Sequence, residues 1–139
     1  MSGFVTLRDA GAAYRDEVEA RRRRLVLVRA GSQRLRGEGG VHGRRGHALV
    51  TWPAHRRTEA IAGRRNGAAL LFVSPLFATR SHPGAVALGP VRAAMIGRGL
   101  GVVVIALGGM DERRFRRVRQ LGFDGYAAID AWSGITPAR

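Results

Sequence analysis

Polar side chains that could hold an anion follow a short apolar run in the middle of the chain. The run is Ala69–Val73, and the residues after it include Thr79, Ser81 and His82. Hydroxyl groups and a histidine at the carboxyl end of a buried strand are donors with which α/β proteins build oxyanion or phosphate sites. The alternative is an ordinary strand–loop–helix connection with solvated polar residues, and these residues alone leave both interpretations open.

A second apolar run ends in a pair of glycines. The run covers residues 101–107, the pair is Gly108 and Gly109, and a helix-like segment follows over residues 111–121. Paired glycines let main-chain N–H groups approach an anion closely, and the start of the next helix adds the positive end of its dipole. If the two runs are parallel strands, their carboxyl ends converge and form one phosphate site.

The elements that must position these residues alternate along the chain. We expect strands over residues 3–8, 25–30, 40–43, 48–52, 69–73, 101–110 and 122–130. We expect helices over residues 10–24, 54–65, 89–98 and 111–121. Seven strands that alternate with helices are typical of a parallel α/β sheet with right-handed crossovers. No linker divides the chain, so residues 1–139 are expected to form one domain.

Two local features of these elements are open to test. Pro53 should end the fourth strand at Trp52, because proline has no N–H to donate to a ladder. In the helix over residues 89–98, the apolar side chains Val91, Met95 and Ile96 are expected to face inward.

Three segments resemble the thiamine phosphate synthase and TenI-type thiazole tautomerase family. They are residues 73–81 (VSPLFATRS), 105–110 (IALGGM) and 125–129 (GYAAI), in the order and spacing of that family's last three strands. The resemblance implies a TIM-type (β/α) barrel of parallel strands. It also implies that the barrel lacks its first β/α unit, because residues 3–8 resemble the family's second strand.

The family joins a hydroxymethylpyrimidine pyrophosphate to a thiazole phosphate and releases pyrophosphate. The resemblance assigns the thiazole phosphate to two hydroxyl residues, the glycine pair and the end of the last strand: Thr79, Ser81, Gly108, Gly109, Ile129 and Asp130. On the pyrophosphate side it assigns catalytic positions to Arg8 and to His82, which replaces a family lysine.

Magnesium belongs to the family's chemistry, and its carboxylate ligands are expected near Arg29 and within residues 42–47. Neither place contains an aspartate or glutamate. Magnesium prefers hard oxygen ligands, so no metal ligand is assigned, and this chain is not expected to bind magnesium in the family's manner.

Two functions follow from the resemblance. The first is a thiamine phosphate synthase-like protein of thiamine biosynthesis, with the thiazole-phosphate side retained and the pyrophosphate side degraded. The second is a non-catalytic, phosphate-binding or regulatory TenI-like protein. The tautomerase branch uses a histidine after the fifth strand. Here His55 lies two residues later, where it either reaches the barrel mouth as a proton shuttle or faces solvent.

Composition limits the partners. The chain has 24 basic and 10 acidic residues, a net charge of +14 and no cysteine, and every basic residue is arginine. Such a chain attracts phosphates, and arginine binds them in a bidentate manner. No nucleic-acid recognition motif accompanies the charge, so we expect a phosphorylated small molecule instead. No apolar run reaches the ~18–20 residues of a membrane helix, which makes a cytoplasmic location the expectation.

A barrel without its first strand has two open edges. Unpaired main-chain groups at these edges need a cover, and a second copy of the chain is one way to provide it. Collapse of the sheet within one chain is the other.

Overall fold

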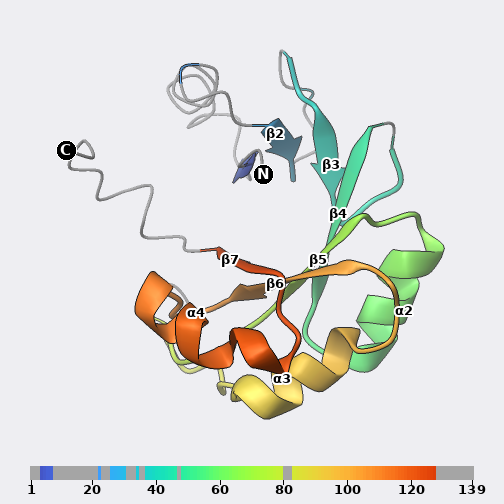
Figure 1. The fold of residues 1–139 in the computed structure, drawn as a ribbon. Coiled ribbons are helices and arrows are strands. Elements are labelled where there is room, and N and C mark those ends of the chain that lie inside the picture. The colour runs from blue at the N-terminus through green and yellow to red at the C-terminus, as the bar shows by residue number, and fades with distance from the viewer. Residues whose placement is uncertain are drawn as a thin grey trace.

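The computed structural model describes residues 4–7, 22, 26–30, 34, 37–46, 48–79 and 83–127. In this part of the chain seven strands form one curled sheet (Figure 1). The strands are β1 (Phe4–Leu7), β2 (Val26–Arg29), β3 (Gly40–His42), β4 (Leu49–Ala54), β5 (Leu70–Val73), β6 (Val103–Leu107) and β7 (Gly125–Ala127). They pair in chain order and every pair is parallel. The predicted parallel α/β fold of the TIM type is confirmed.

Three described helices cover one face of this sheet. They are α2 (Arg57–Arg65), α3 (Pro90–Gly97) and α4 (Glu112–Val118), and the 3₁₀ turn η1 (Arg119–Leu121) follows α4. Figure 1 shows them as a layer outside strands β4 to β7. The helix expected over residues 10–24 lies outside the described residues, apart from Arg22.

Close contacts between helix glycines and strand side chains identify the face that the helices cover. A Cβ built on Gly63 in α2 would lie 2.7 Å from the Trp52 ring and 2.9 Å from Leu71. A Cβ on Gly97 in α3 would lie 2.6 Å from a Val104 methyl group. Side chains alternate across a parallel sheet, so Trp52, Leu71 and Val104 belong to the outer face and their chain neighbours to the inner face.

The main core lies between the helices and the outer face. It contains the strand residues Val50, Leu71 and Val104 together with Ala60 of α2 and Ile96 of α3. The inner face has its own buried side chains, Val28, Thr51, Phe72 and Ile105. Both faces are therefore buried at the centre of the sheet, which explains why its strands are continuous apolar runs in the sequence.

Strand β4 does not end at Trp52 as predicted, because it continues through Pro53 to Ala54. The amide of Ser74 donates to the Ala54 carbonyl oxygen at 3.2 Å, so Ala54 takes part in the ladder with β5. The main-chain groups of Pro53, between two residues bonded to β5, face the other neighbour. There β3 has already ended at His42, so the missing N–H costs no ladder bond.

The inward assignment of Val91 and Met95 was wrong. These side chains are 62% and 60% exposed, and only Ile96 of the predicted three is buried. Helix α3 packs through Ala93, Ile96 and Gly97, whose i, i+3, i+4 spacing forms a stripe of mostly small residues. Small side chains let the helix approach Val104 closely, and this turns the larger apolar residues outward.

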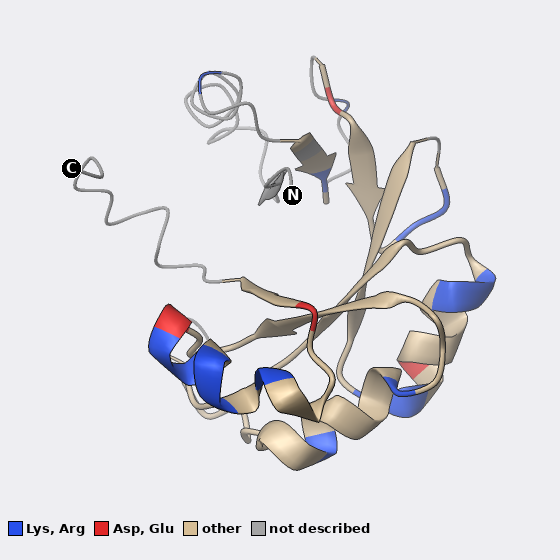
Figure 2. Cartoon of the chain, in the orientation of Figure 1, with Lys and Arg blue, Asp and Glu red and all other residues tan. Residues whose placement is uncertain are grey.

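Arginines lie along all three helices and dominate the charge of this layer (Figure 2). The carboxylates there are engaged locally: Glu59 pairs with Arg56 and Glu112 with Arg116. The outer surface is thus strongly cationic.

Candidate functional site

The loops after β5 and β6 lie directly against each other. The amide of Leu76 donates to the Leu107 carbonyl oxygen at 3.0 Å, and the amide of Phe77 donates to the Gly108 carbonyl oxygen at 3.1 Å. These two bonds continue the β5–β6 pairing beyond the ends of the strands. They bring the predicted hydroxyl loop and the predicted glycine pair together at the carboxyl end of the sheet.

The two glycines are required by how closely these loops approach. Gly108 has φ +104°, and a Cβ there would lie 2.7 Å from the Cα of Pro75. Gly109 has φ +61°, and a Cβ there would lie 2.8 Å from the carbonyl oxygen of Ala78. Any side chain at either position would push the loops apart, so both positions require glycine.

Arg114 in α4 joins the same two loops. Its Nη1 donates to the Gly109 carbonyl oxygen, and its guanidinium carbon lies 4.7 Å from the centre of the Phe77 ring. The amide of Arg114 donates to Oδ1 of Asp111 at 2.7 Å, so Asp111 is the N-cap of α4.

Of the predicted site residues, the structure describes three. Gly108 and Gly109 lie at the loop junction, and Thr79 follows Ala78 in the loop that Gly109 contacts. The remaining five lie outside the described residues, and their assignments stay predictions: Arg8, Ser81, His82, Ile129 and Asp130.

His55 is exposed at the carboxyl end of β4, and its ring reaches the end of β5. Its Nδ1 lies 2.9 Å from the carbonyl oxygen of Ser74 and 3.3 Å from the Ser74 hydroxyl. A carbonyl oxygen can only accept, so the hydrogen bond places a proton on Nδ1 and makes Nε2 the basic nitrogen of the neutral ring. This orients the histidine at the edge of the sheet where the two loops meet.

His42 occupies the inner face of β3. Its Nδ1 lies 2.8 Å from Oγ1 of the fully buried Thr51, and its ring meets Phe72 edge-on with centroids 5.6 Å apart. Contacts with side chains of β4 and β5 thus fix the ring on the inner face of the sheet.

The residues at the family's magnesium positions do not fit that ion. Arg29 pairs with Glu38 at 2.9 Å, and Arg44 donates to the Ala30 carbonyl oxygen at 3.2 Å. Among the described residues, no group of three histidine, aspartate or glutamate side chains could hold a metal. Arg29 and Arg44 bring cations into this region, and the carboxylate of Glu38 is engaged by Arg29.

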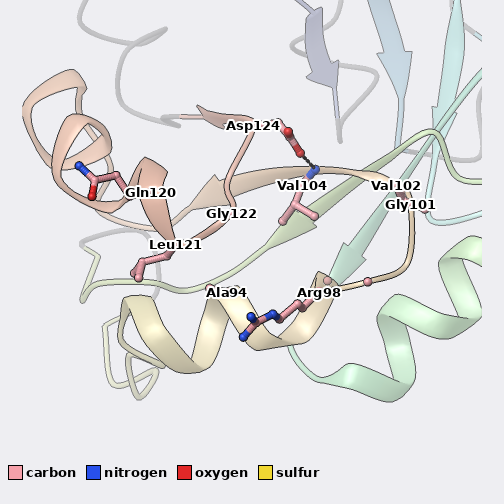
Figure 3. Close-up of a pocket in the computed structure, with 11 residues that line it drawn as sticks. Ala94, Arg98, Gly101, Val102, Val104, Gln120, Leu121, Gly122 and Asp124 are labelled. Carbon is pink, nitrogen blue, oxygen red and sulfur yellow. Dashed lines mark hydrogen bonds between the residues drawn. The ribbon is translucent and has the colours of Figure 1, made fainter.

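A cavity of about 520 Å³ lies at the amino end of the sheet, where β6 begins (Figure 3). It is bounded by the glycine-rich turn between α3 and β6, by the end of η1 and by Asp124, whose carboxylate accepts from the Val104 amide at 2.8 Å. In barrels of this class, chemistry is found at the carboxyl ends of the strands. The cavity is therefore distinct from the predicted phosphate site.

Sequence reasoning missed two contributors to this edge. Arg114 was assigned only to a helix, although residues in a first helical turn lean back toward the preceding loop. Ser74 directly follows the apolar run 69–73, and no role is predicted for it. The proximity of its carbonyl to His55 follows from the β4–β5 register, in which Ala54 pairs with Val73.

No helix within the described ranges is long and apolar enough to cross a bilayer. The cytoplasmic location stays a prediction.

Comparison with known proteins supports the resemblance. Residues 42–132, more than half of the chain, match the family model described as thiamine monophosphate synthase. The thiamine-phosphate synthase of Chloroflexus aurantiacus is 33% identical over 87 residues, which are 62% of this chain and 40% of the relative. That of Syntrophomonas wolfei is 32% identical over 89 residues, 63% of this chain and 43% of the relative. The matches thus span about two fifths of the relatives' length.

Solved structures agree on the fold. A thiamine phosphate pyrophosphorylase from Pyrococcus furiosus superposes with a TM-score of 0.69 at 20% identity, over 94% of this chain and 74% of the other. The native KDPGal structure superposes with a TM-score of 0.62 at 14% identity, over 99% of this chain and 74% of the other. With the match over residues 42–132, the glycine junction after β6 and the parallel TIM-type sheet, the chain belongs to the thiamine monophosphate synthase family.

Proposed function

We propose that this chain binds a thiazole phosphate at the junction of the β5 and β6 loops and acts in thiamine phosphate synthesis. One observation carries the proposal. The hydrogen bonds from Leu76 and Phe77 to Leu107 and Gly108 hold together the two loops to which the resemblance assigns the phosphate. Main-chain N–H groups and the Thr79 hydroxyl would surround the phosphate oxygens, since glycines leave the main chain accessible.

The reaction of the family needs charge stabilisation more than a nucleophilic side chain, because pyrophosphate leaves with its negative charge. Arg8 and His82 would serve on that side of the site. Because the residues at the magnesium positions do not fit the ion, we propose that binding of thiazole phosphate does not depend on magnesium. Calorimetric titrations with magnesium and with a chelator test this, and a strong dependence on magnesium would contradict it.

The decisive experiment compares a phosphorylated with an unphosphorylated ligand. Thiazole alcohol phosphate should bind, and the free thiazole alcohol should bind much more weakly, because the junction offers donors to the phosphate. Thr79→Val should weaken phosphate binding by about tenfold, the usual cost of losing a hydrogen bond to a charged group. Thr58→Val is the matched control, since Thr58 is exposed on α2. Equal affinity of wild type for both ligands would refute the phosphate site.

Catalysis is measured separately. Wild-type protein mixed with hydroxymethylpyrimidine pyrophosphate and thiazole phosphate should release pyrophosphate if it is a synthase. Binding without turnover would identify the non-catalytic, phosphate-binding alternative.

The position of His55 favours a second candidate function, proton transfer of the thiazole tautomerase kind. The Ser74 carbonyl keeps the proton on Nδ1, so Nε2 is ready to take a proton from a ligand at the loop junction. His55→Gln should abolish tautomerisation of a thiazole phosphate. Ser74→Ala should retain most of it, because the main-chain carbonyl that orients the ring remains. Full activity of His55→Gln would remove this candidate.

We also propose that two copies associate through the sheet edges. In the described sheet β1 and β7 each pair with one neighbour, which leaves one side of each strand without a ladder. The net charge of +14 opposes association, so the dimer should tighten as salt screens the repulsion. Sedimentation at several salt concentrations measures this. A monomer at every salt and protein concentration would contradict it.

A further inference from the structure

The arginine that spans the loop junction has a more specific task than the other arginines of the outer layer. We propose that Arg114 is a positioning residue that locks the loop after β6 onto the loop after β5 and thereby sets the affinity of this edge for a phosphate dianion. The proposal rests on the proposed function for its ligand. The contact it invokes can be tested without any ligand.

Arg114 is held from three directions. Its amide is bonded to Asp111 within its own helix, its Nη1 is bonded to the Gly109 carbonyl oxygen, and its guanidinium lies over the Phe77 ring. The first contact fixes the base of the side chain, and the other two fix its tip against both loops. An arginine can do this because its planar guanidinium stacks on an aromatic face while its N–H groups donate in the ring-parallel plane.

The contact with Gly109 acts on the main-chain groups that the phosphate would use. Gly109 has φ +61° and no side chain, so nothing but its neighbours restrains its peptide planes. By holding the carbonyl oxygen of Gly109, Arg114 fixes the plane of the peptide that follows. A loop ordered before the ligand arrives loses less entropy on binding, which raises affinity without any direct contact.

The guanidinium also leaves a positive charge beside the junction. It has five N–H donors, and one nitrogen is engaged with Gly109. No carboxylate is paired with its side chain in the described part of the chain; the carboxylate of Asp111 accepts from its main-chain amide instead. A full positive charge at this place favours a dianionic phosphate over an uncharged ligand.

The test compares Arg114→Ala and Arg114→Lys with Arg117→Ala, an exposed arginine one turn further along the same helix. Two quantities are measured in each protein: the affinity for inorganic phosphate and the amide hydrogen-exchange rate of Phe77, whose N–H bridges the two loops. Arg114→Ala should weaken phosphate binding by about tenfold, because it removes both the contact that orders the Gly109 peptide and the positive charge beside it. It should also speed Phe77 exchange relative to the Ala69 amide, which bonds to Val50 within the sheet.

Arg114→Lys should recover part of the phosphate affinity through its charge and little of the Phe77 protection, because an ammonium does not reproduce the fork and the stacking together. Arg117→Ala should change both quantities by less than about twofold, since exposed charges without contacts contribute little. If Arg114→Ala unfolds, Arg114→Lys carries the comparison alone. Equal exchange and equal affinity in the Arg114 variants and wild type would overturn the proposal.

The two proposals fail differently. If wild type does not bind phosphate but Arg114→Ala speeds Phe77 exchange, the loop contact stands and the ligand assignment is wrong. If wild type binds phosphate and Arg114→Ala changes neither quantity, the phosphate site stands and the role of Arg114 is wrong.

Discussion

At the scale of single residues, the glycines at the loop junction combine two constraints that can be separated by substitution. Gly109 has a positive φ, and a Cβ built on it would also lie within 3 Å of the carbonyl oxygen of Ala78. Gly67, between α2 and β5, has φ +84° but no atom within 4 Å of that position. Comparing substitutions at Gly109 and Gly67 therefore distinguishes main-chain strain from steric crowding.

Gly109→Ala should destabilise the protein more than Gly67→Ala. Both variants carry the strain of a left-handed residue, about 1–2 kcal/mol. Only Gly109→Ala must also move the loop after β5, so it alone should abolish phosphate binding. Urea unfolding and phosphate titration of the two variants measure this. Retained phosphate binding in Gly109→Ala would show that close approach of these loops is dispensable.

The sequence indicated the glycine pair but not Arg114, and the reason is physical. Two adjacent glycines after an apolar run have few explanations other than a main chain that must be closely approached or left-handed. An arginine in a helix rich in arginines has many. Its role depends on where Phe77 lies, and that position follows from the pairing of β5 with β6, which no local pattern of residues encodes.

At the scale of elements, α2 and α3 are joined by a side chain that acts as a C-terminal cap. Nη1 of Arg57, the first residue of α2, lies 3.1 Å from the Ile96 carbonyl oxygen and 2.5 Å from that of Arg98. The last carbonyls of a helix have no partner within it, and a cation near them also meets the negative end of the helix dipole.

Arg57→Ala should lower the free energy of unfolding by about 1–2 kcal/mol, because the end of α3 loses both its donor and its positive charge. Arg64→Ala is the matched control, since Arg64 is exposed on the same helix and should change stability by less than about 0.5 kcal/mol. Thermal or urea unfolding measures both. Equal losses in the two variants would show that Arg57 contributes only as one more surface charge.

Strands were easier to predict than the packing of helices. Apolar runs bounded by glycine and proline marked the strands, because burial on both faces demands continuous hydrophobicity. The buried stripe of α3 could not be read in the same way. Hydrophobicity selects Val91 and Met95, whereas close packing against Val104 selects Ala93 and Gly97. The fourth strand was predicted, but its continuation through Pro53 to Ala54 was missed, because proline is harmless only where the neighbouring strand has already ended.

At the scale of the whole molecule, uncompensated positive charge should make stability depend on salt. The chain carries +14, and arginines crowd the helical layer in Figure 2. Repulsion among these charges destabilises the compact state, and salt screens it. Raising sodium chloride from about 0.01 M to about 1 M shortens the screening length from ~30 to ~3 Å, so the melting temperature should rise.

A variant with fewer positive charges provides the control for this prediction. Replacing Arg113 and Arg117 by glutamine removes two exposed cations from α4. Its melting temperature should exceed that of wild type at low salt and should rise less as salt is added. Chloride is used because phosphate and sulfate resemble the ligand proposed for the junction. A melting temperature that falls as chloride is added would contradict the repulsion.

Substitutions in the core and at the proposed site should differ in how much they lower the free energy of unfolding. Most of the buried core lies between the helices and outer-face residues such as Leu71 and Val104. The proposed phosphate site lies instead at polar and main-chain groups of the loops beyond β5 and β6, whose apolar residues Leu76 and Met110 belong to the core. A lineage could therefore exchange or lose ligand-binding residues while the packing that holds the fold persists. During evolution, residues on one side of the proposed site can thus be substituted and their function lost before the fold is destabilised.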